Sequence, residues 1–311
     1  MGKTAFLFPG QGSQYPGMTR DLYESIPEVH DFYEECEAIR PGTLDQMFSG
    51  SEEELKKTEN TQPCLFLADL AGAIALKKNG IEPDAAAGFS LGEIVGLAAS
   101  GILTGPEAFR LVCKRGKLMQ EAADRVNGKM VAVMRMENDV LQELCREYGV
   151  YPVNYNCPGQ TVVSGEAEKT EQFIGKLTEL KARFVELKVG GAFHTPYMEA
   201  AAKGLKEELL REGGYDLKQP VIPLYANKTA MPYAGSREEM IGTVSAQICS
   251  SVQWADTLIH MAESGVDTFI ECGPGKALSG FVKRTVEGAG ILNVSDTESL
   301  KKAMEVLKKD A

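Results

Sequence analysis

The sequence predicts an α/β protein with a parallel-sheet core into which a small β-α-β-β-α-β unit is inserted. Two observations support this fold class. Over most of the chain, short apolar runs typical of strands alternate with longer segments of helical periodicity, and one internal stretch interrupts that alternation. With 311 residues, of which 43% are hydrophobic and 25% charged, the chain is long enough to bury a substantial core.

The core elements follow one another along the chain. A first strand, in TAFLFPGQGSQ, ends in a glycine-rich loop. Helical periodicity then predicts helices over residues 21–39, 62–78 and 106–123. Apolar runs bounded by turn residues predict further strands over residues 84–89, 221–225, 267–271 and 290–294. Strands separated by helices favour parallel pairing, because a parallel connection has to cross over the sheet.

The inserted unit has a different order of elements. Its patterns predict strands over residues 129–136, 151–156, 161–164 and 183–189, and helices over residues 139–148 and 166–180. The order β-α-β-β-α-β is that of a ferredoxin-like unit. We therefore predict a discontinuous core formed by residues 1–124 and 193–311, with a ferredoxin-like subdomain over residues 125–192. A ligand is expected in the cleft between the two units.

Composition narrows the class of protein. The net charge of −11 argues against nucleic acid or an anionic membrane as the main partner. The seven cysteines form no C-x-x-C pair, which favours reduced thiols over disulfides or a metal site. The first apolar run is too short for a signal peptide, and CLFLADLAGAIAL is too short to span a bilayer. We expect a cytoplasmic protein without a bound metal.

The stretch GFSLG, residues 88–92, is the first candidate for chemistry. By itself a Gly-x-Ser-x-Gly pattern is weak, since Ser90 could simply occupy a turn of small residues. Its context is stronger, because a predicted strand precedes it and LGEIVGLAASG follows with helical spacing. In a strand-turn-helix setting the serine oxygen is exposed at a helix N-terminus, where free N–H groups can stabilise an oxyanion.

A serine nucleophile needs a base, which is most often histidine. His30 lies in an acidic helical stretch and His260 within an amphipathic helix, so both favour surface or packing roles. His194 follows a glycine-rich segment where the predicted subdomain ends, and Pro196 can begin the next helix. We predict His194 as the base, with a structural loop histidine as the alternative. No acidic residue near His194 is an obvious third member.

Six segments together resemble the malonyl-CoA:acyl-carrier-protein transacylases over nearly the whole chain. They are FLFPGQGSQYPGM at residues 6–18, GFSLGE at 88–93, KRGKLMQEA at 114–122, GAFHTPYM at 191–198, QICSSVQW at 247–254 and ECGPGKAL at 271–278. None suffices alone, but their order and spacing make the resemblance specific. It implies an α/β-hydrolase-like core with a ferredoxin-like insertion, in agreement with the patterns above.

The resemblance also implies a role for individual residues. Ser90 would be the nucleophile and His194 its base. Gln247 would hold the imidazole through a carbonyl oxygen, in place of the carboxylate of a serine-protease-like triad. Gln11 and Leu91 would donate backbone N–H groups to the oxyanion.

Two further residues would select the substrate. Beside Lys114 and Lys117, Arg115 would be read as part of a solvated basic face, but the matching arginine of the family pairs with the malonyl carboxylate. A guanidinium suits that task because it offers two parallel N–H donors to a planar carboxylate. Phe193 corresponds to the family's malonyl-selective position, where phenylalanine fills the room that an α-methyl group needs.

The chain departs from the family pattern at two points. Phe89 stands where a histidine is usual, and SSVQW at residues 250–254 stands where SPVRW is common. The first change removes a polar neighbour of the nucleophile, and the second weakens the match around Gln247. Neither alters the reaction class that the resemblance implies.

The resemblance implies malonyl-CoA and an acyl carrier protein as partners, and no cofactor, since CoA is a co-substrate. An acidic carrier would need a local basic patch, for which the candidates are Lys181, Arg183, Lys188, Lys276, Lys283 and Arg284. Three alternatives stay open: a free-standing polyketide synthase acyltransferase, a thioester hydrolase on the same scaffold, and a non-catalytic module that binds carrier protein.

Overall fold

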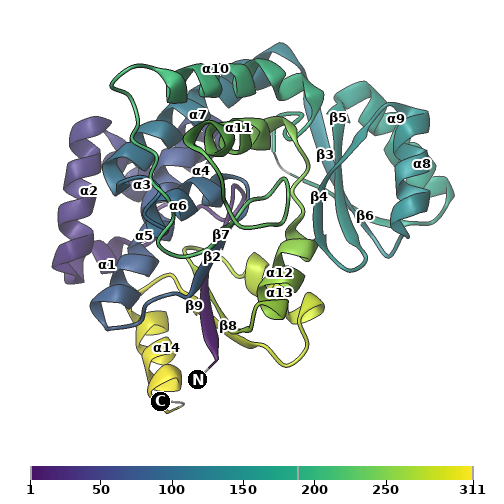
Figure 1. Cartoon of the computed structure of the whole chain (residues 1–311). Coiled ribbons are helices and arrows are strands. Elements are labelled where there is room, and N and C mark those ends of the chain that lie inside the picture. The colour runs from purple at the N-terminus through teal and green to yellow at the C-terminus, as the bar shows by residue number, and fades with distance from the viewer. Residues whose placement is uncertain (1, 188, 310–311) are drawn as a thin grey trace.

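A computed structural model describes residues 2–187 and 189–309 of the chain. Its core is a five-stranded sheet with the order β7-β2-β1-β8-β9, in which every neighbouring pair is parallel (Figure 1). The strands are β1 (Lys3–Phe8), β2 (Ala85–Gly88), β7 (Leu224–Tyr225), β8 (Val266–Cys272) and β9 (Gly290–Val294). The predicted parallel α/β core is confirmed.

Helices cover this sheet. They are α1 (Arg20–Ser25), α2 (Pro27–Ile39), α3 (Thr43–Ser49), α4 (Glu52–Lys56), α5 (Thr58–Lys78), α6 (Leu91–Ala99), α7 (Gly105–Arg125), α10 (Glu199–Leu210), α11 (Arg237–Ala246), α12 (Trp254–Glu263), α13 (Ala277–Thr285) and α14 (Thr297–Lys309). There are also two short 3₁₀ turns. One, η1 (Pro196–Met198), precedes α10, and the other, η2 (Gln247–Cys249), follows α11. None of the described helices combines the length and apolar composition that crossing a lipid bilayer requires.

Two elements differ from the sequence-based expectation. The helix expected over residues 21–39 is divided, because Ile26 is extended with φ −117° and ψ 107° and Pro27 begins α2. Proline at a first helical position is favourable, since it has no N–H to leave unpaired. The strand expected over residues 221–225 is reduced to β7, since Val221 is 80% exposed and its N–H donates to Ser100.

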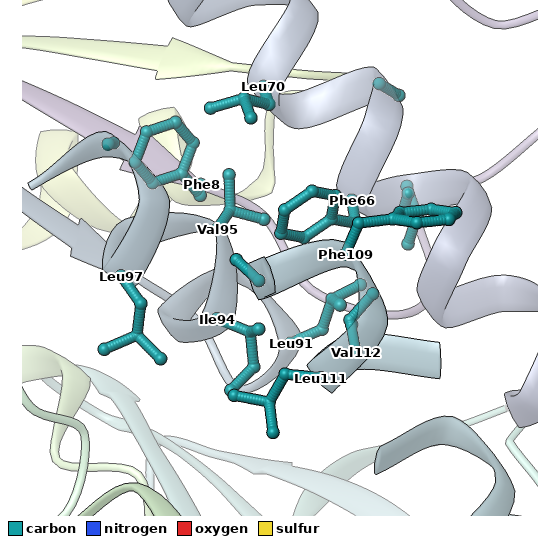
Figure 2. Packing of buried hydrophobic residues seen from close by; sticks show 14 of the residues in the cluster. Phe8, Phe66, Leu70, Leu91, Ile94, Val95, Leu97, Phe109, Leu111 and Val112 are labelled. Carbon is teal, nitrogen blue, oxygen red and sulfur yellow. The ribbon is translucent and has the colours of Figure 1, made fainter. Parts of the chain in front are cut away.

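Packing of α6 between α5 and α7 fixes the helix that follows Ser90. Leu91, Ile94 and Val95 lie among apolar side chains of these neighbours (Figure 2). The rings of Phe66 on α5 and Phe109 on α7 lie 5.8 Å apart beside them, and both are fully buried. Full burial of each such side chain contributes about 1.5–3 kcal/mol. The start of α6 is therefore held in a rigid part of the core.

The inserted unit is a four-stranded antiparallel sheet with the order β4-β5-β3-β6. It consists of β3 (Gly128–Met134), α8 (Asn138–Tyr148), β4 (Tyr151–Cys157), β5 (Gln160–Glu166), α9 (Ala167–Glu179) and β6 (Arg183–Glu186). This is the predicted β-α-β-β-α-β order, and α8 and α9 pack on one face over a separate apolar cluster (Figure 1). The division of the chain at residues 125 and 192 stays a prediction.

Main-chain hydrogen bonds join the inserted unit to the core at the segment that follows η2. Val252 donates its N–H to Val153 on β4 at 2.8 Å and accepts from the Tyr155 N–H at 2.9 Å. The Ser251 hydroxyl donates to the Pro152 carbonyl at 2.9 Å. These bonds fix one strand of the inserted unit against the segment that follows η2, so that both units can line one cavity.

Candidate active site

Ser90 lies on a sharp turn between β2 and α6. Its backbone has φ 54° and ψ −102°, a region that residues with a side chain rarely occupy. The flanking glycines are required by close approach: a Cβ on Gly88 would lie 1.9 Å from Gly92, and one on Gly92 would lie 2.1 Å from the Phe8 carbonyl oxygen. The turn that the GFSLG pattern predicts is therefore present.

This turn lies at the carboxyl edge of the parallel sheet, one strand away from the point at which the strand order reverses. From β1 the chain passes to β2 on one side, whereas β8 pairs with β1 on the other. The loops after adjacent strands diverge at such a point and leave a crevice at their carboxyl ends. Gln11 follows β1 and Ser90 follows β2, and both line one cavity. Side chains of the inserted unit, including Met130 and Asn154, line it too.

His194 approaches Ser90 from the segment that leaves the inserted unit. Its Nε2 lies 2.8 Å from Ser90 Oγ. On the opposite side of the ring, Nδ1 lies 3.0 Å from the backbone carbonyl of Gln247 and 3.1 Å from that of Ser250. Because a carbonyl can only accept, Nδ1 carries the proton and Nε2 is free to accept from the serine hydroxyl. The Gln247 contact comes from its main chain, and not from its side chain.

Burial keeps this imidazole neutral. His194 is 5% exposed, and burial, together with the nearby charge of Arg115, lowers its pKa from 6.5 to about 4. The two carbonyl contacts oppose that shift without reversing it. A neutral imidazole at neutral pH is the form that a general base requires. The other histidines lie elsewhere: His30 is exposed and stacks on Tyr23, and His260 contacts the Ala230 carbonyl.

Arg115 lies inside the site and not on a solvated face. It comes from α7 and is fully buried, and its Nη2 donates to Ser90 Oγ at 3.2 Å and to Gln247 Oε1 at 2.8 Å. Its Nη1 donates to Gln62 Oε1 at 2.9 Å. Burial lowers the pKa of Arg115 to about 10, so the group stays charged at neutral pH. Within the described residues its Nε has no hydrogen-bond partner.

The remaining predicted residues line the same cavity. Leu91 is the first residue of α6, where backbone N–H groups have no partner within the helix. Gln11 lies across from it on the loop after β1, with its side chain donating to Thr58 at 3.4 Å. Phe193 is 6% exposed and packs beside His194. Phe89 also lines the cavity, and its ring meets that of Trp254 edge-on at 5.4 Å.

Sequence reasoning missed a layer of polar side chains behind Ser90. Glu93 is 1% exposed, and Asn227 and Gln62 are buried as well. Asn227 Oδ1 accepts from the Ser90 N–H at 2.7 Å. Glu93 stands in the quoted GFSLGE segment, where a carboxylate inside an apolar helix was an available signal. Asn227 lies in YANKTA, which offered no signal.

The fold and this group of side chains define the chain as an acyltransferase. The parallel core with its antiparallel insertion presents a serine and a histidine beside a buried arginine, and a family model described as acyl transferase domain matches residues 5–306. Curated relatives include a malonyl CoA-acyl carrier protein transacylase of Bacillus subtilis, 38% identical over 100% of this chain and 99% of its own length. One from Staphylococcus aureus is 34% identical over 97% and 98%.

Solved structures agree with these relatives. The malonyl CoA-acyl carrier protein transacylase from Clostridium perfringens superposes with a TM-score of 0.92 at 35% identity, covering 99% of this chain and 98% of its own. A malonyl-transacylase in complex with a type II PKS acyl-carrier protein superposes with a TM-score of 0.91 at 34% identity, over 98% and 99%. The chain belongs to the malonyl CoA-acyl carrier protein transacylase family.

Proposed function

We propose that the chain transfers a malonyl group from malonyl-CoA to the phosphopantetheine thiol of an acyl carrier protein, through a malonyl ester of Ser90. The observation that carries this proposal is the buried guanidinium of Arg115, whose Nη2 lies 3.2 Å from Ser90 Oγ. In a malonyl ester only one methylene separates the acyl carbon from the free carboxylate. A cation this close to the nucleophile therefore suits a malonyl group.

The first half-reaction forms the ester. His194 Nε2 takes the proton of the Ser90 hydroxyl as Oγ attacks the thioester carbon of malonyl-CoA. The oxyanion receives the backbone N–H groups of Gln11 and Leu91, the latter at the positive end of α6. When the tetrahedral intermediate collapses, the carbon–sulfur bond breaks and the CoA sulfur takes the proton from His194.

The second half-reaction uses the same groups in reverse. The carrier's phosphopantetheine thiol loses its proton to His194 and attacks the malonyl ester. The new thioester forms as the bond to Ser90 Oγ breaks, and His194 returns the proton to the serine. Carbonyl contacts from Gln247 and Ser250 keep the imidazole in the required tautomer, although they stabilise an imidazolium less than a carboxylate would.

Arg115 and Phe193 would set substrate choice. The Nε and Nη2 of Arg115 offer one edge of a guanidinium to the malonyl carboxylate, and the unpartnered Nε would gain an acceptor. An acetyl group offers no acceptor and leaves that donor unsatisfied. The buried ring of Phe193 would fill the space beside the acyl group that an α-methyl substituent needs.

The proposed reaction requires no cofactor, because malonyl-CoA supplies the acyl group and both half-reactions are proton and acyl transfers. We also propose that the protein works in the cytoplasm. A separate proposal concerns the carrier's landing patch: Lys181, Arg183, Lys276, Lys283 and Arg284 are exposed, and Lys188 lies outside the described residues. The proposed core of residues 1–124 and 193–311 and subdomain of residues 125–192 would form the two sides of the cleft.

A polyketide carrier protein is the second candidate partner. The chemistry would be identical, and the neighbour that holds a type II PKS acyl-carrier protein supports this possibility. Thioester hydrolysis is less well supported, because the curated relatives of the chain are named transacylases.

The test is the intact mass of the protein after brief exposure to malonyl-CoA or acetyl-CoA. We expect a malonyl adduct on the wild type, none on Ser90→Ala and less on Arg115→Ala. Free CoA without an adduct would favour the hydrolase. If the wild type forms no adduct and releases no free CoA, the catalytic assignment is contradicted. Adding fatty-acid and polyketide carrier proteins in parallel then identifies the acceptor.

A further inference from the structure

Glu93, in the first turn of α6, is a buried carboxylate that the proposed reaction does not use. Its Oε2 accepts from the Asn227 N–H at 2.8 Å and from Gln247 Nε2 at 3.4 Å, and its Oε1 accepts from the Tyr233 hydroxyl. Burial raises the pKa of Glu93 to about 7, but all three partners donate and the charge of Arg115 lies nearby, so the contacts favour the ionised form. An ionised carboxylate satisfies this set, whereas a protonated one would bring a competing donor.

One path leads from Glu93 to the nucleophile through Asn227. The carboxylate holds the Asn227 main chain, and the Asn227 side chain holds the turn. Its Oδ1 accepts from the Ser90 N–H at 2.7 Å, and its Nδ2 donates to the Gly88 carbonyl at 2.6 Å. These two hydrogen bonds hold the backbone in place on both sides of Phe89. They stabilise the backbone of Ser90 in its unfavourable positive φ.

A second path leads from Glu93 to Arg115 through Gln247. The amide nitrogen of Gln247 faces three acceptors: the Ser90 carbonyl at 2.6 Å, Asn227 Oδ1 at 3.2 Å and Glu93 Oε2 at 3.4 Å. The amide oxygen must then face the other way, where it accepts from Arg115 Nη2 at 2.8 Å. Glu93 is therefore one of three acceptors that together fix which end of Gln247 meets the guanidinium.

We propose that Glu93 is a positioning residue, whose buried carboxylate fixes the Ser90 turn through Asn227 and the Arg115 guanidinium through Gln247. For the acyl substrate this inference rests on the proposed function. For the reactivity of Ser90 it does not, because the same turn aims the serine toward any electrophile.

The test compares Glu93→Gln with the wild type in two reactions of Ser90. The first is malonylation by malonyl-CoA, followed by intact mass. The second is phosphonylation by an alkyl fluorophosphonate, in which an Oγ–P bond forms, fluoride leaves and His194 accepts the serine proton. Glutamine keeps the size of glutamate but has one acceptor oxygen instead of two, so a donor amide faces either Tyr233 or the pair Asn227 and Gln247. Loss of alignment should slow both reactions roughly 10- to 100-fold.

Glu271→Gln is the matched control for a buried carboxylate. Glu271 is also 1% exposed, and it accepts from the backbone N–H groups of Leu278 and Ser279 at 3.2 and 2.8 Å, away from Ser90. We expect this variant to react at nearly the wild-type rate, even if its melting temperature falls as far as that of Glu93→Gln. Both variants are assayed well below their melting temperatures.

The outcomes separate this inference from the proposed function. If the wild type takes phosphonate but no malonyl group, the acyl substrate is wrong, and a slow Glu93→Gln phosphonylation still supports positioning. Wild-type rates for Glu93→Gln in both reactions would overturn it, and so would equal slowing of Glu271→Gln. If Glu93→Gln does not fold, Asn227→Ala is tested in the same two assays. Wild-type rates of malonylation and phosphonylation for that variant would also overturn the inference.

Discussion

His194 Nε2 lies 2.8 Å from Ser90 Oγ, while its Nδ1 faces two carbonyl oxygens and, among the residues that the structure describes, no carboxylate. This pairing joins residues that are 104 positions apart in the chain. It combines a base that burial keeps neutral with partners that fix its tautomer but bring no negative charge. The consequences can be measured in stability as well as in rate.

The first prediction concerns stability in acid. Burial lowers the pKa of His194 to about 4 in the folded protein, whereas an unfolded histidine titrates near 6.5. The unfolded state therefore binds the proton first, so the stabilisation is present above pH 6.5 and is lost as the pH falls through 4. We expect a loss of about 2.4 kcal/mol from this group, measured by urea unfolding at pH 7 and pH 4.5.

His194→Gln serves as the comparison for that measurement, because it removes the titrating group. Glu93 acts in the opposite direction: burial raises its pKa to about 7, so its contribution is present below pH 4.5 and is lost as the pH rises through 7. Both proteins carry Glu93, and the difference between their pH dependences therefore reports His194. Equal dependences would contradict a buried neutral imidazole.

The second prediction concerns the charge at Arg115. Two charge-assisted hydrogen bonds to a malonyl carboxylate, each worth about 1.5–3 kcal/mol, set the expected loss in Arg115→Ala at roughly 10²- to 10⁴-fold in kcat/KM for malonyl-CoA. Arg115→Lys should recover only part, because an ammonium cannot bridge Gln62, Gln247 and a carboxylate in one plane. Steady-state rates with malonyl-CoA and acetyl-CoA, side by side, check this.

Lys117→Ala provides the matched variant, since Lys117 lies two residues further along α7 and is exposed. It should leave malonyl-CoA turnover unchanged. Reaction with acetyl-CoA should fall far less than that with malonyl-CoA in Arg115→Ala. A parallel loss for both substrates would mean that Arg115 maintains the site and does not select the acid.

Local signals explain why much of the site was predictable. The Ser90 turn depends on adjacent residues, since Gly88 and Gly92 approach backbone too closely for a side chain. A strand, a glycine turn and a helix are all readable from one short segment. His194 could be predicted as the base because the chain has three histidines and only one lies at the predicted junction. The roles of Arg115 and Gln247 required the family resemblance.

What the sequence could not predict depends on contacts between distant segments. Asn227 reaches Ser90 across 137 positions, and Glu93 reaches Tyr233 across 140. No local pattern encodes such a meeting. The error at residues 221–223 has a similar cause: the first part of an apolar run lies outside β7, because the Val221 N–H pairs with the Ser100 carbonyl rather than with a strand. Whether such an apolar run becomes a buried strand depends on the contacts it makes in the folded protein.

The third prediction concerns substrate size. Phe193 is buried against the cavity, and its ring packs closely on Gly191, where an added Cβ would lie only 2.7 Å from the ring. Phe193→Ala opens space for an α-methyl group. The ratio of kcat/KM for methylmalonyl-CoA to that for malonyl-CoA should rise at least about tenfold, the order that one methyl group decides in a tight pocket. Phe193→Leu should give a smaller rise, and an unchanged ratio in both would remove Phe193 from substrate selection.

The fourth prediction concerns the carrier protein. Lys283 and Arg284 lie exposed in the last turn of α13, a helix that contacts β4 of the inserted unit (Figure 1). The charge of Arg284 reaches Cys157, at the end of β4, where it opposes the rise in that thiol's pKa that burial causes. This surface therefore borders both units, and an acidic carrier would meet positive charge there although the whole chain carries −11.

Reversing both charges, in Lys283→Glu with Arg284→Glu, should raise KM for the carrier protein roughly tenfold and leave Ser90 malonylation unchanged. The effect should shrink as salt is added, because exposed charges more than about 8–10 Å apart are screened at physiological ionic strength. Lys203→Glu with Lys206→Glu makes the same change of charge on exposed positions of α10. If that pair raises the carrier KM equally, only net charge matters. If neither pair does, the carrier docks elsewhere.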